Sequence, residues 1–227
     1  MRRLILFDVD GTLVRGGPAR VAFRVAMDAT FGTSGAIDGH DFSGKTDPQI
    51  AHELLDGTGL NTAVVEAGLP ALWDRYLAEL EFRLVGTPMQ AIPGAGELVR
   101  ALEESGLAAL GLVTGNIARG AHLKLHSVGL GNRFPIGSFG SDHEVRQHLP
   151  AIAIRRARER WGVDFGCADV WVIGDTPLDI ACGHHQGVRT LAVATGRHPV
   201  EELAACGPDA VVEDLRDVTG ALATLLD

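Results

Sequence analysis

Aromatic residues, cysteine and basic residues are all scarce in this sequence. Aromatic residues make up 5% of its 227 residues, whereas apolar residues as a whole make up 46%. Such a chain can bury a core, built mainly from Ala, Val and Leu, and is not intrinsically disordered. Its three cysteines, Cys167, Cys182 and Cys206, are odd in number and form no C-x-x-C pair. We therefore expect reduced thiols rather than a disulfide framework.

Positive charge is in deficit. The chain carries 29 acidic and 20 Lys and Arg residues, which gives a formal net charge of −9. Proteins that bind nucleic acid normally present a basic face, so we expect no nucleic-acid partner. An acidic surface also repels anionic substrates at long range. Any phosphate site must therefore be made locally, from a metal ion, a few cations and backbone amides.

Long apolar runs are missing as well. The N-terminal run at Leu4–Phe7 meets acid at Asp8, and it is too short for a signal peptide or a membrane span. We expect a soluble, cytoplasmic protein with no membrane partner. The nucleotide-binding patterns G-x-x-x-x-G-K-[ST] and G-x-G-x-x-G are absent too, so no nucleotide cofactor is implied.

Short apolar runs alternate with helical patterns along most of the chain. Runs that are apolar on both faces suit buried parallel strands. Their alternation with helices predicts an α/β fold, a doubly wound Rossmann-like parallel sheet. Strands are expected at Leu4–Val9, Leu107–Val113, Val170–Ile173, Thr190–Val193 and Ala210–Val212, and helices at Glu97–Glu104, Ala118–Val128, Pro150–Trp161, Leu178–His185, Pro199–Ala205 and Leu215–Leu226.

Residues 14–88 break this alternation. They offer helical patterns at Ala19–Phe31, Pro48–Leu55 and Thr62–Leu84, but no convincing strand. Glycines at 16–17 and the Gly-Thr-Pro stretch at 86–88 are typical of hinges. We therefore predict an α/β core domain of residues 1–14 and 89–227, with an inserted α-helical cap domain at 15–88.

Several carboxylates follow predicted strands. Asp8 and Asp10 end the first strand, and Asp175 follows the strand at Val170–Ile173. Ligands of open parallel sheets bind beyond the carboxyl ends of the strands, so these side chains are expected to converge. In a continuing strand, Asp8 and Asp10 would share one face. With Asp179 one helical turn beyond Asp175, four carboxylates predict a hard divalent cation with oxygen ligands, and we expect Mg²⁺. Taken singly, Asp10-Gly11 also suits a turn and Asp175 a helix cap.

Three segments carry a family resemblance. Residues 7–13 (FDVDGTL), 112–116 (LVTGN) and 173–179 (IGDTPLD) resemble, in order, the first, second and fourth motifs of the haloacid dehalogenase (HAD) superfamily. The similarity spans essentially the whole chain. With helical segments between the first two motifs, the chain is most similar to the phosphoglycolate phosphatase-like group, which carries a helical cap. The resemblance implies a Mg²⁺-dependent phosphomonoester hydrolase acting on small phosphorylated metabolites.

The resemblance also implies roles for the acidic residues. Asp8 would attack phosphorus and form an aspartyl-phosphate. Asp10 would protonate the leaving alkoxide and then activate water. Mg²⁺ would be held by Asp8, the backbone carbonyl of Asp10, and Asp175. Asp179 would orient this metal site through hydrogen bonds rather than contact the ion.

Phosphate binding is expected from the second motif. The Thr114 hydroxyl would act on phosphoryl oxygens, with the backbone amides of Gly115 and Asn116 beside it at a helix start. In the inserted segment, FSGKTD at residues 42–47 resembles the substrate-facing loop of related caps, and Lys45 would present a cation to the substrate. Thr46 or Asp47 also suits a cap for the helix that begins near Pro48.

The third motif departs from the family pattern, which has a Lys ahead of a helix. Lys124 lies within a predicted helix and too early in the chain. We assign this role to Arg146, in the stretch GSDHEVRQH at 140–148, because a guanidinium can bridge the nucleophile and phosphate. The alternative is an arginine in a surface loop. Arginine and lysine are not equivalent, so the rate and phosphate geometry are expected to differ from those of relatives.

Other functions share this core. A dehalogenase needs neither Asp10 nor Mg²⁺, so the complete acidic set argues against it. A phosphonatase would need a cap lysine to form an imine, for which Lys45 is available. A sugar phosphomutase would differ only in how the cap controls water. A non-catalytic protein that binds a phosphorylated ligand is the alternative from another class. The sequence leaves the substrate, and the choice between monomer and homodimer, open.

Overall fold

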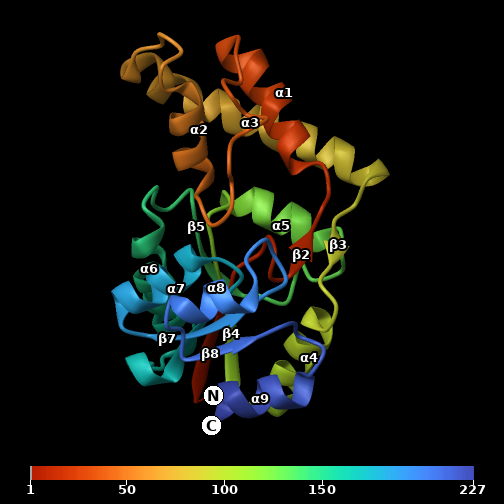
Figure 1. Cartoon of the computed structure of the whole chain (residues 1–227), viewed down its shortest axis with the longest axis vertical. Helices are drawn as coiled ribbons and strands as arrows, with labels where there is room; N and C mark the ends of the chain where they lie inside the picture. The colour runs from red at the N-terminus through yellow and green to blue at the C-terminus, as the bar shows by residue number, and fades with distance from the viewer. Residues whose placement is uncertain (1) are drawn as a thin grey trace.

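The computed structural model describes residues 2–227 and is built around a six-stranded parallel sheet of order β5-β4-β1-β6-β7-β8 (Figure 1). The central strand β1 pairs with β4 on one side and β6 on the other. The strands are β1 (Arg3–Phe7), β4 (Ala108–Thr114), β5 (Ile136–Phe139), β6 (Val170–Gly174), β7 (Arg189–Val193) and β8 (Ala210–Val212). The predicted parallel α/β fold is confirmed.

Helices cover both faces of the sheet. Residues Ile5 and Phe7 of β1 point into the core that includes α4, α5 and α9, whereas Leu4 and Leu6 point to the opposite core beside α6. Because both faces of β1 are buried, its residues from Leu4 to Phe7 are all apolar. The helices of this part are α4 (Ala95–Ser105), α5 (Ala118–His126), α6 (Leu149–Trp161), α7 (Pro177–Gln186), α8 (Val200–Ala205) and α9 (Val218–Leu226).

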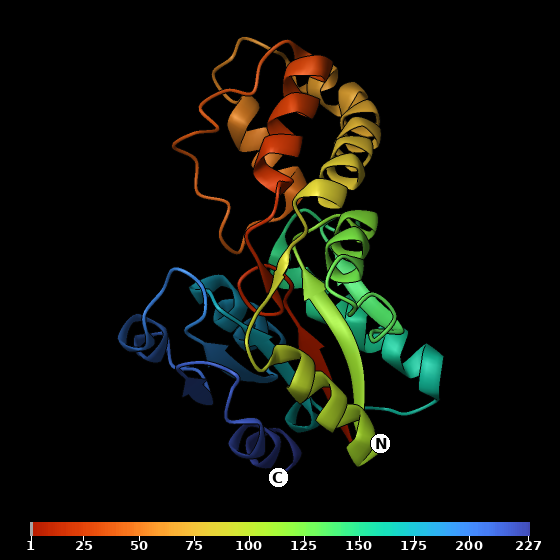
Figure 2. The same cartoon turned by 90° about the vertical axis from the view of Figure 1, so that its right-hand side faces the viewer.

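Three further helices form a separate group beyond the carboxyl ends of the strands. They are α1 (Ala19–Phe31), α2 (Asp47–Leu55) and α3 (Thr62–Gly86), and α1 packs along α3 (Figure 2). The sequence predicts their bounds closely because each has a local start or stop signal. Gly32 ends α1 in a left-handed conformation, Thr46 caps α2 ahead of Pro48, and Asn61 caps α3. We keep the division at 15–88 as a proposal.

The segments that lead into and out of this helical group pair with each other. Strand β2 (Val14–Arg15) runs antiparallel to β3 (Gln90–Ala91), which forms a two-residue ribbon. The expectation of no strand within residues 14–88 is therefore wrong at this point. Two-residue strands carry no periodic pattern that sequence analysis could detect. Within residues 2–227, no helix combines the length and apolar content that a bilayer crossing requires.

Two other local predictions are also corrected. Strand β1 ends at Phe7 rather than Val9, because the chain turns there: the N–H groups of Leu13 and Val14 both donate to the Val9 carbonyl. Asp8 and Asp10 therefore do not share a face of a continuing strand. Strand β5 was not expected, since its four residues include Gly137 and Ser138, which carry little strand signal.

Candidate active site

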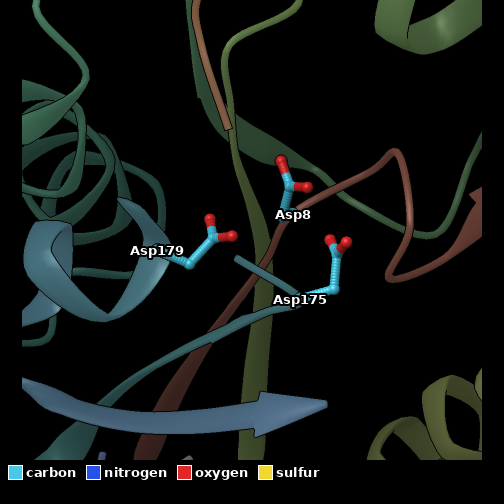
Figure 3. Close-up of side chains that lie close together, drawn as sticks. All are labelled: Asp8, Asp175 and Asp179. Carbon is cyan, nitrogen blue, oxygen red and sulfur yellow. The ribbon is translucent and has the colours of Figure 1, made fainter. Parts of the chain in front are cut away.

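Three carboxylates meet at the carboxyl end of the sheet (Figure 3). Asp8 directly follows β1, Asp175 directly follows β6, and Asp179 lies in the first turn of α7. All three are buried, and one oxygen from each lies within 4.8 Å of the others. Parallel strands bring these residues together because their carboxyl ends meet at one edge.

Burial makes this cluster electrostatically costly. It raises the pKa of Asp8 to about 6, although the nearby Arg146 guanidinium opposes the shift. Burial raises the pKa of Asp175 further, to about 8, and the charges of Asp179 and Asp8 add to the effect. Crowded carboxylates of this kind are relieved by protons or by a cation with oxygen ligands. The residues therefore fit a divalent metal ion.

Arg146 pairs with two of the three acids, Asp8 and Asp179. A 3₁₀ turn at Arg146–His148, ahead of α6, places its Nη2 atom 2.9 Å from Asp8 Oδ1 and 2.5 Å from Asp179 Oδ1. Burial opposes its charge, but the carboxylates of Asp179 and Asp8 raise its pKa above the ordinary value. Only 7% of the residue is exposed, so the alternative of a surface-loop arginine is wrong.

Asp179 has both carboxylate oxygens occupied. Oδ2 accepts from the Thr176 N–H and hydroxyl, at 3.1 and 2.7 Å, in a capping box at the start of α7. Oδ1 accepts from Arg146. With its oxygens engaged in this way, Asp179 is suited to orient Arg146 and the metal site, which agrees with the role implied by its sequence motif.

Asp10 takes part in a separate polar network. Its Oδ2 atom accepts from Lys124 Nζ at 2.6 Å and from Asn116 Nδ2 at 2.8 Å. Lys124 Nζ also donates to Asn116 Oδ1 at 2.6 Å, and Asn116 Nδ2 contacts the Thr114 hydroxyl at 2.8 Å. The side chain of Asn116, and not only its backbone, thus joins the site.

Lys124 is the site residue that sequence analysis set aside. It lies in α5, and its side chain is 5% exposed. The one available signal is its position three residues after Ala121 and one before Leu125, on the buried face of the helix. A lysine on such a face needs a polar partner inside the protein.

The turn after β4 is in contact with the start of α2. The Asp47 N–H donates to the Gly115 carbonyl, and the Ile117 N–H donates to Asp47 Oδ2, both at 2.7 Å. Gly115 admits this approach, because a Cβ atom there would lie 2.0 Å from the carbonyl oxygen of Lys45. The Thr114 side chain at the end of β4 is fully buried. Burial raises the pKa of Asp47 to about 6, and the charge of Lys124 opposes the shift.

A pocket of about 380 Å³ lies between the sheet edge and the helical group. Asp8, Asp10, Thr114 and Asp175 border it from the sheet side. Its apolar border comes from the helical group and consists of Ala19, Phe23, Phe42, Ile50 and Tyr76. Lys45 borders the pocket too, but its amine is paired with Glu53. The site therefore combines an acidic floor that fits a divalent cation with a partly apolar wall.

Comparisons with known proteins agree with this geometry. Residues 5–184 match the sequence profile of the haloacid dehalogenase-like hydrolase family. The chain is 29% identical to an N-acetylmuramic acid 6-phosphate phosphatase of Pseudomonas aeruginosa, over 97% of this chain and 94% of the relative. It is 28% identical to a phosphoglycolate phosphatase of Synechococcus elongatus, over 98% of both. A hydrolase from Pseudomonas syringae shares the fold, with a TM-score of 0.74, 22% identity and full coverage of both chains.

Proposed function

Because the chain belongs to the haloacid dehalogenase-like hydrolase family, we propose that it is a phosphatase that hydrolyses phosphomonoesters of small metabolites. The observation that carries this proposal is the convergence of Asp8, Asp175 and Asp179 at the carboxyl end of the sheet, where Arg146 pairs with Asp8 and Asp179. The two relatives described above are named for small phosphate esters, which supports the same substrate class.

The proposed reaction has two displacements at phosphorus. A carboxylate oxygen of Asp8 bonds to phosphorus as the bond to the ester oxygen breaks, and the departing alkoxide takes a proton from Asp10. Asp10 then takes a proton from the water that attacks the aspartyl-phosphate. This second step breaks the bond between phosphorus and Asp8 and releases inorganic phosphate.

Arg146 has a clear task in this scheme. It holds Asp8 Oδ1 with a 2.9 Å hydrogen bond, which fixes the carboxylate plane and leaves the other oxygen for attack. Its positive charge also offsets repulsion between the nucleophile and an incoming phosphate. Thr114, at the end of β4, is placed to donate its hydroxyl to a phosphoryl oxygen.

Mg²⁺ is the proposed metal, because the donor set is made of oxygens. Asp8, Asp175 and the backbone carbonyl of Asp10 would hold it, and Asp179 would orient the set through Arg146. When bound, the ion supplies positive charge that offsets repulsion between Asp8 and the phosphoryl group. The raised pKa of Asp175, at about 8, supports this because the crowded acids need a counter-charge.

The helical group at residues 15–88 is proposed to act as a cap. It provides the apolar wall of the pocket, and its Lys45 lies at the border. Closure over the sheet edge would exclude bulk water from the reacting groups. The contacts of Asp47 with the turn at 115–117 support such a closed arrangement.

The test is phosphate release from a panel of phosphoglycolate, sugar phosphates, amino-sugar phosphates and nucleotides, each with Mg²⁺ and with EDTA. Asp8→Asn should lose turnover, while the matched control Asp28→Asn, on an exposed position of α1, should keep it. Denatured wild type trapped during turnover should carry a phosphate that hydroxylamine removes, and Asp8→Asn should not.

Each outcome of this panel has a distinct meaning. Turnover that persists in Asp8→Asn would show that the nucleophile is wrong. Rearrangement of a sugar phosphate without net phosphate release would identify a mutase instead. Binding of esters without any turnover would identify a non-catalytic phosphate-binding protein.

A further inference from the structure

Lys124 has no role in the scheme above, although its amine is among the most buried groups of the site. Its side chain is 5% exposed, and its Nζ atom makes two hydrogen bonds of 2.6 Å, to Asp10 and Asn116. Burying an ammonium group is costly unless it is paired and hydrogen-bonded. An apolar residue would serve this face of α5 at lower cost if packing were its only role.

The lysine content of the chain adds a second observation. The sequence has only two lysines, Lys45 and Lys124, against 18 arginines, and both lysines border the same pocket. An ammonium is a compact point charge on a flexible stem, whereas a guanidinium is a larger planar fork. The compact ammonium group of Lys124 fits between two acceptors, Asp10 and Asn116, which follow different strands.

The two carboxylate oxygens of Asp10 differ in their contacts. Its Oδ2 accepts both hydrogen bonds, whereas none of the described residues (2–227) donates to Oδ1. The side chain is 43% exposed and borders the pocket, so Oδ1 stays open to a ligand. Asn116 braces the pair, because it donates to Asp10 and accepts from Lys124.

We infer that Lys124 is a positioning residue for Asp10: it anchors Oδ2 so that Oδ1 is presented to the leaving group of the substrate. This inference rests on the proposed phosphatase function. When Asp10 protonates the departing alkoxide, its carboxyl group must lie within hydrogen-bond reach of the ester oxygen. Without the anchor, the carboxyl group is free to rotate away, and proton transfer fails while the attack of Asp8 remains possible.

Leaving-group dependence tests this role, because a structural residue would affect all esters alike. The departing nitrophenolate of p-nitrophenyl phosphate is weakly basic and needs little help from an acid. The alkoxide of an alkyl phosphate is strongly basic and depends on it. General acid catalysis contributes about 10²- to 10⁴-fold, so the alkyl ester is the sensitive substrate.

The variants are Lys124→Met, which keeps the length and removes the charge, and Lys124→Gln, which restores a hydrogen-bond donor. We expect Lys124→Met to lower kcat/KM for the best alkyl ester of the panel by about 30-fold, less than the full contribution of general acid catalysis because Asp10 itself remains. The ratio kcat/KM reports the step in which the leaving group departs and excludes the later attack of water, which is common to all esters. Its kcat/KM for p-nitrophenyl phosphate should fall by less than about threefold, because the acid matters little for that leaving group. Lys124→Gln should recover part of the loss, and Asp10→Asn should show the same asymmetry.

An equal loss of kcat/KM for both esters in Lys124→Met would overturn the inference, as would unchanged kcat/KM for the alkyl ester. If Lys124→Met fails to fold, the same comparison is made with Lys124→Gln, for which a smaller but still unequal loss is expected. Wild-type protein that hydrolyses no ester refutes the proposed function itself. Wild-type turnover without the asymmetry refutes the role of Lys124 alone.

Discussion

The backbone N–H of Ile117 donates a 2.7 Å hydrogen bond to the carboxylate of Asp47, which joins the turn after β4 to the first turn of α2. The Asp47 N–H returns a bond of the same length to the Gly115 carbonyl. Ile117 and Asp47 are 70 positions apart, and their contact ties the helical group to the turn that is proposed to bind phosphate. A buried carboxylate at this junction makes the junction sensitive to pH.

Asp47→Asn should change the pH dependence of stability. Burial raises the pKa of Asp47 from about 3.8 to about 6, so the folded protein binds this proton more tightly than the unfolded chain. Its contribution to stability is present below pH 4 and is lost as the pH rises through 6. From pH 4.5 to 7.5, the variant should gain about 2 kcal/mol relative to wild type, measured by urea unfolding. A difference that does not vary with pH would contradict the assignment.

Arg146→Met should destabilise the fold strongly. It leaves the buried carboxylates of Asp8 and Asp179 without their shared cation, and breaking a buried pair costs about 3–5 kcal/mol. Arg155→Met is the matched control, since that side chain is 65% exposed and should contribute less than about 1 kcal/mol. Urea unfolding in the absence of divalent ions measures both. Equal effects of the two variants would contradict the central role of Arg146.

Gly115→Ala should separate the helical group from the sheet edge. Its Cβ would lie 2.0 Å from the carbonyl oxygen of Lys45, so one backbone segment must move, at a cost of about 1–3 kcal/mol. We expect a large loss of kcat/KM for every phosphate ester. Gly96→Ala, inside α4 with no atom near the added Cβ, should instead gain about 0.5 kcal/mol and keep full activity. Full activity of Gly115→Ala would show that this close contact is dispensable.

Metal binding should reverse the stability order of wild type and Asp175→Asn. Without a divalent ion, the variant should melt at or above the wild-type temperature, because it relieves repulsion among the three buried acids. Mg²⁺ at a hundredfold its Kd should add about 2.7 kcal/mol to wild type and to Asp74→Asn, an exposed control in α3. It should leave Asp175→Asn unchanged. A thermal melt with and without the ion measures this, and identical shifts in all three proteins would exclude Asp175 as a ligand.

Much of the fold is predictable because its signals are local. Strands β4 and β6 are largely apolar runs, and Pro or Gly marks many of the helix ends. Short elements escape prediction, as β5 and the ribbon of β2 and β3 show, because pairing with neighbours stabilises them rather than their own pattern. The turn at Asp10 escaped for a similar reason: hydrogen bonds to the Val9 carbonyl end the strand earlier than its apolar residues suggest.

The residues of the candidate site also differ in how well the sequence predicts them. Asp8 and Asp175 could be found from the sequence because strand ends converge in any parallel sheet. Arg146 could be assigned as the cation of the third motif only through the resemblance to the family. The sequence does not predict that Lys124 belongs to the site. Its contact with Asp10 depends on how α5 packs in the fold, and no local pattern predicts that contact.

The scarcity of lysine has a practical consequence for handling the protein. Its only two lysine side chains border one pocket, where Lys45 is 23% and Lys124 is 5% exposed. Reagents that couple dyes, biotin or beads through lysine amines will therefore find no lysine elsewhere on the surface, and a tag that reaches Lys45 will lie at the border of the pocket. Cys167, which is exposed and lies outside that pocket, is the better handle for attachment.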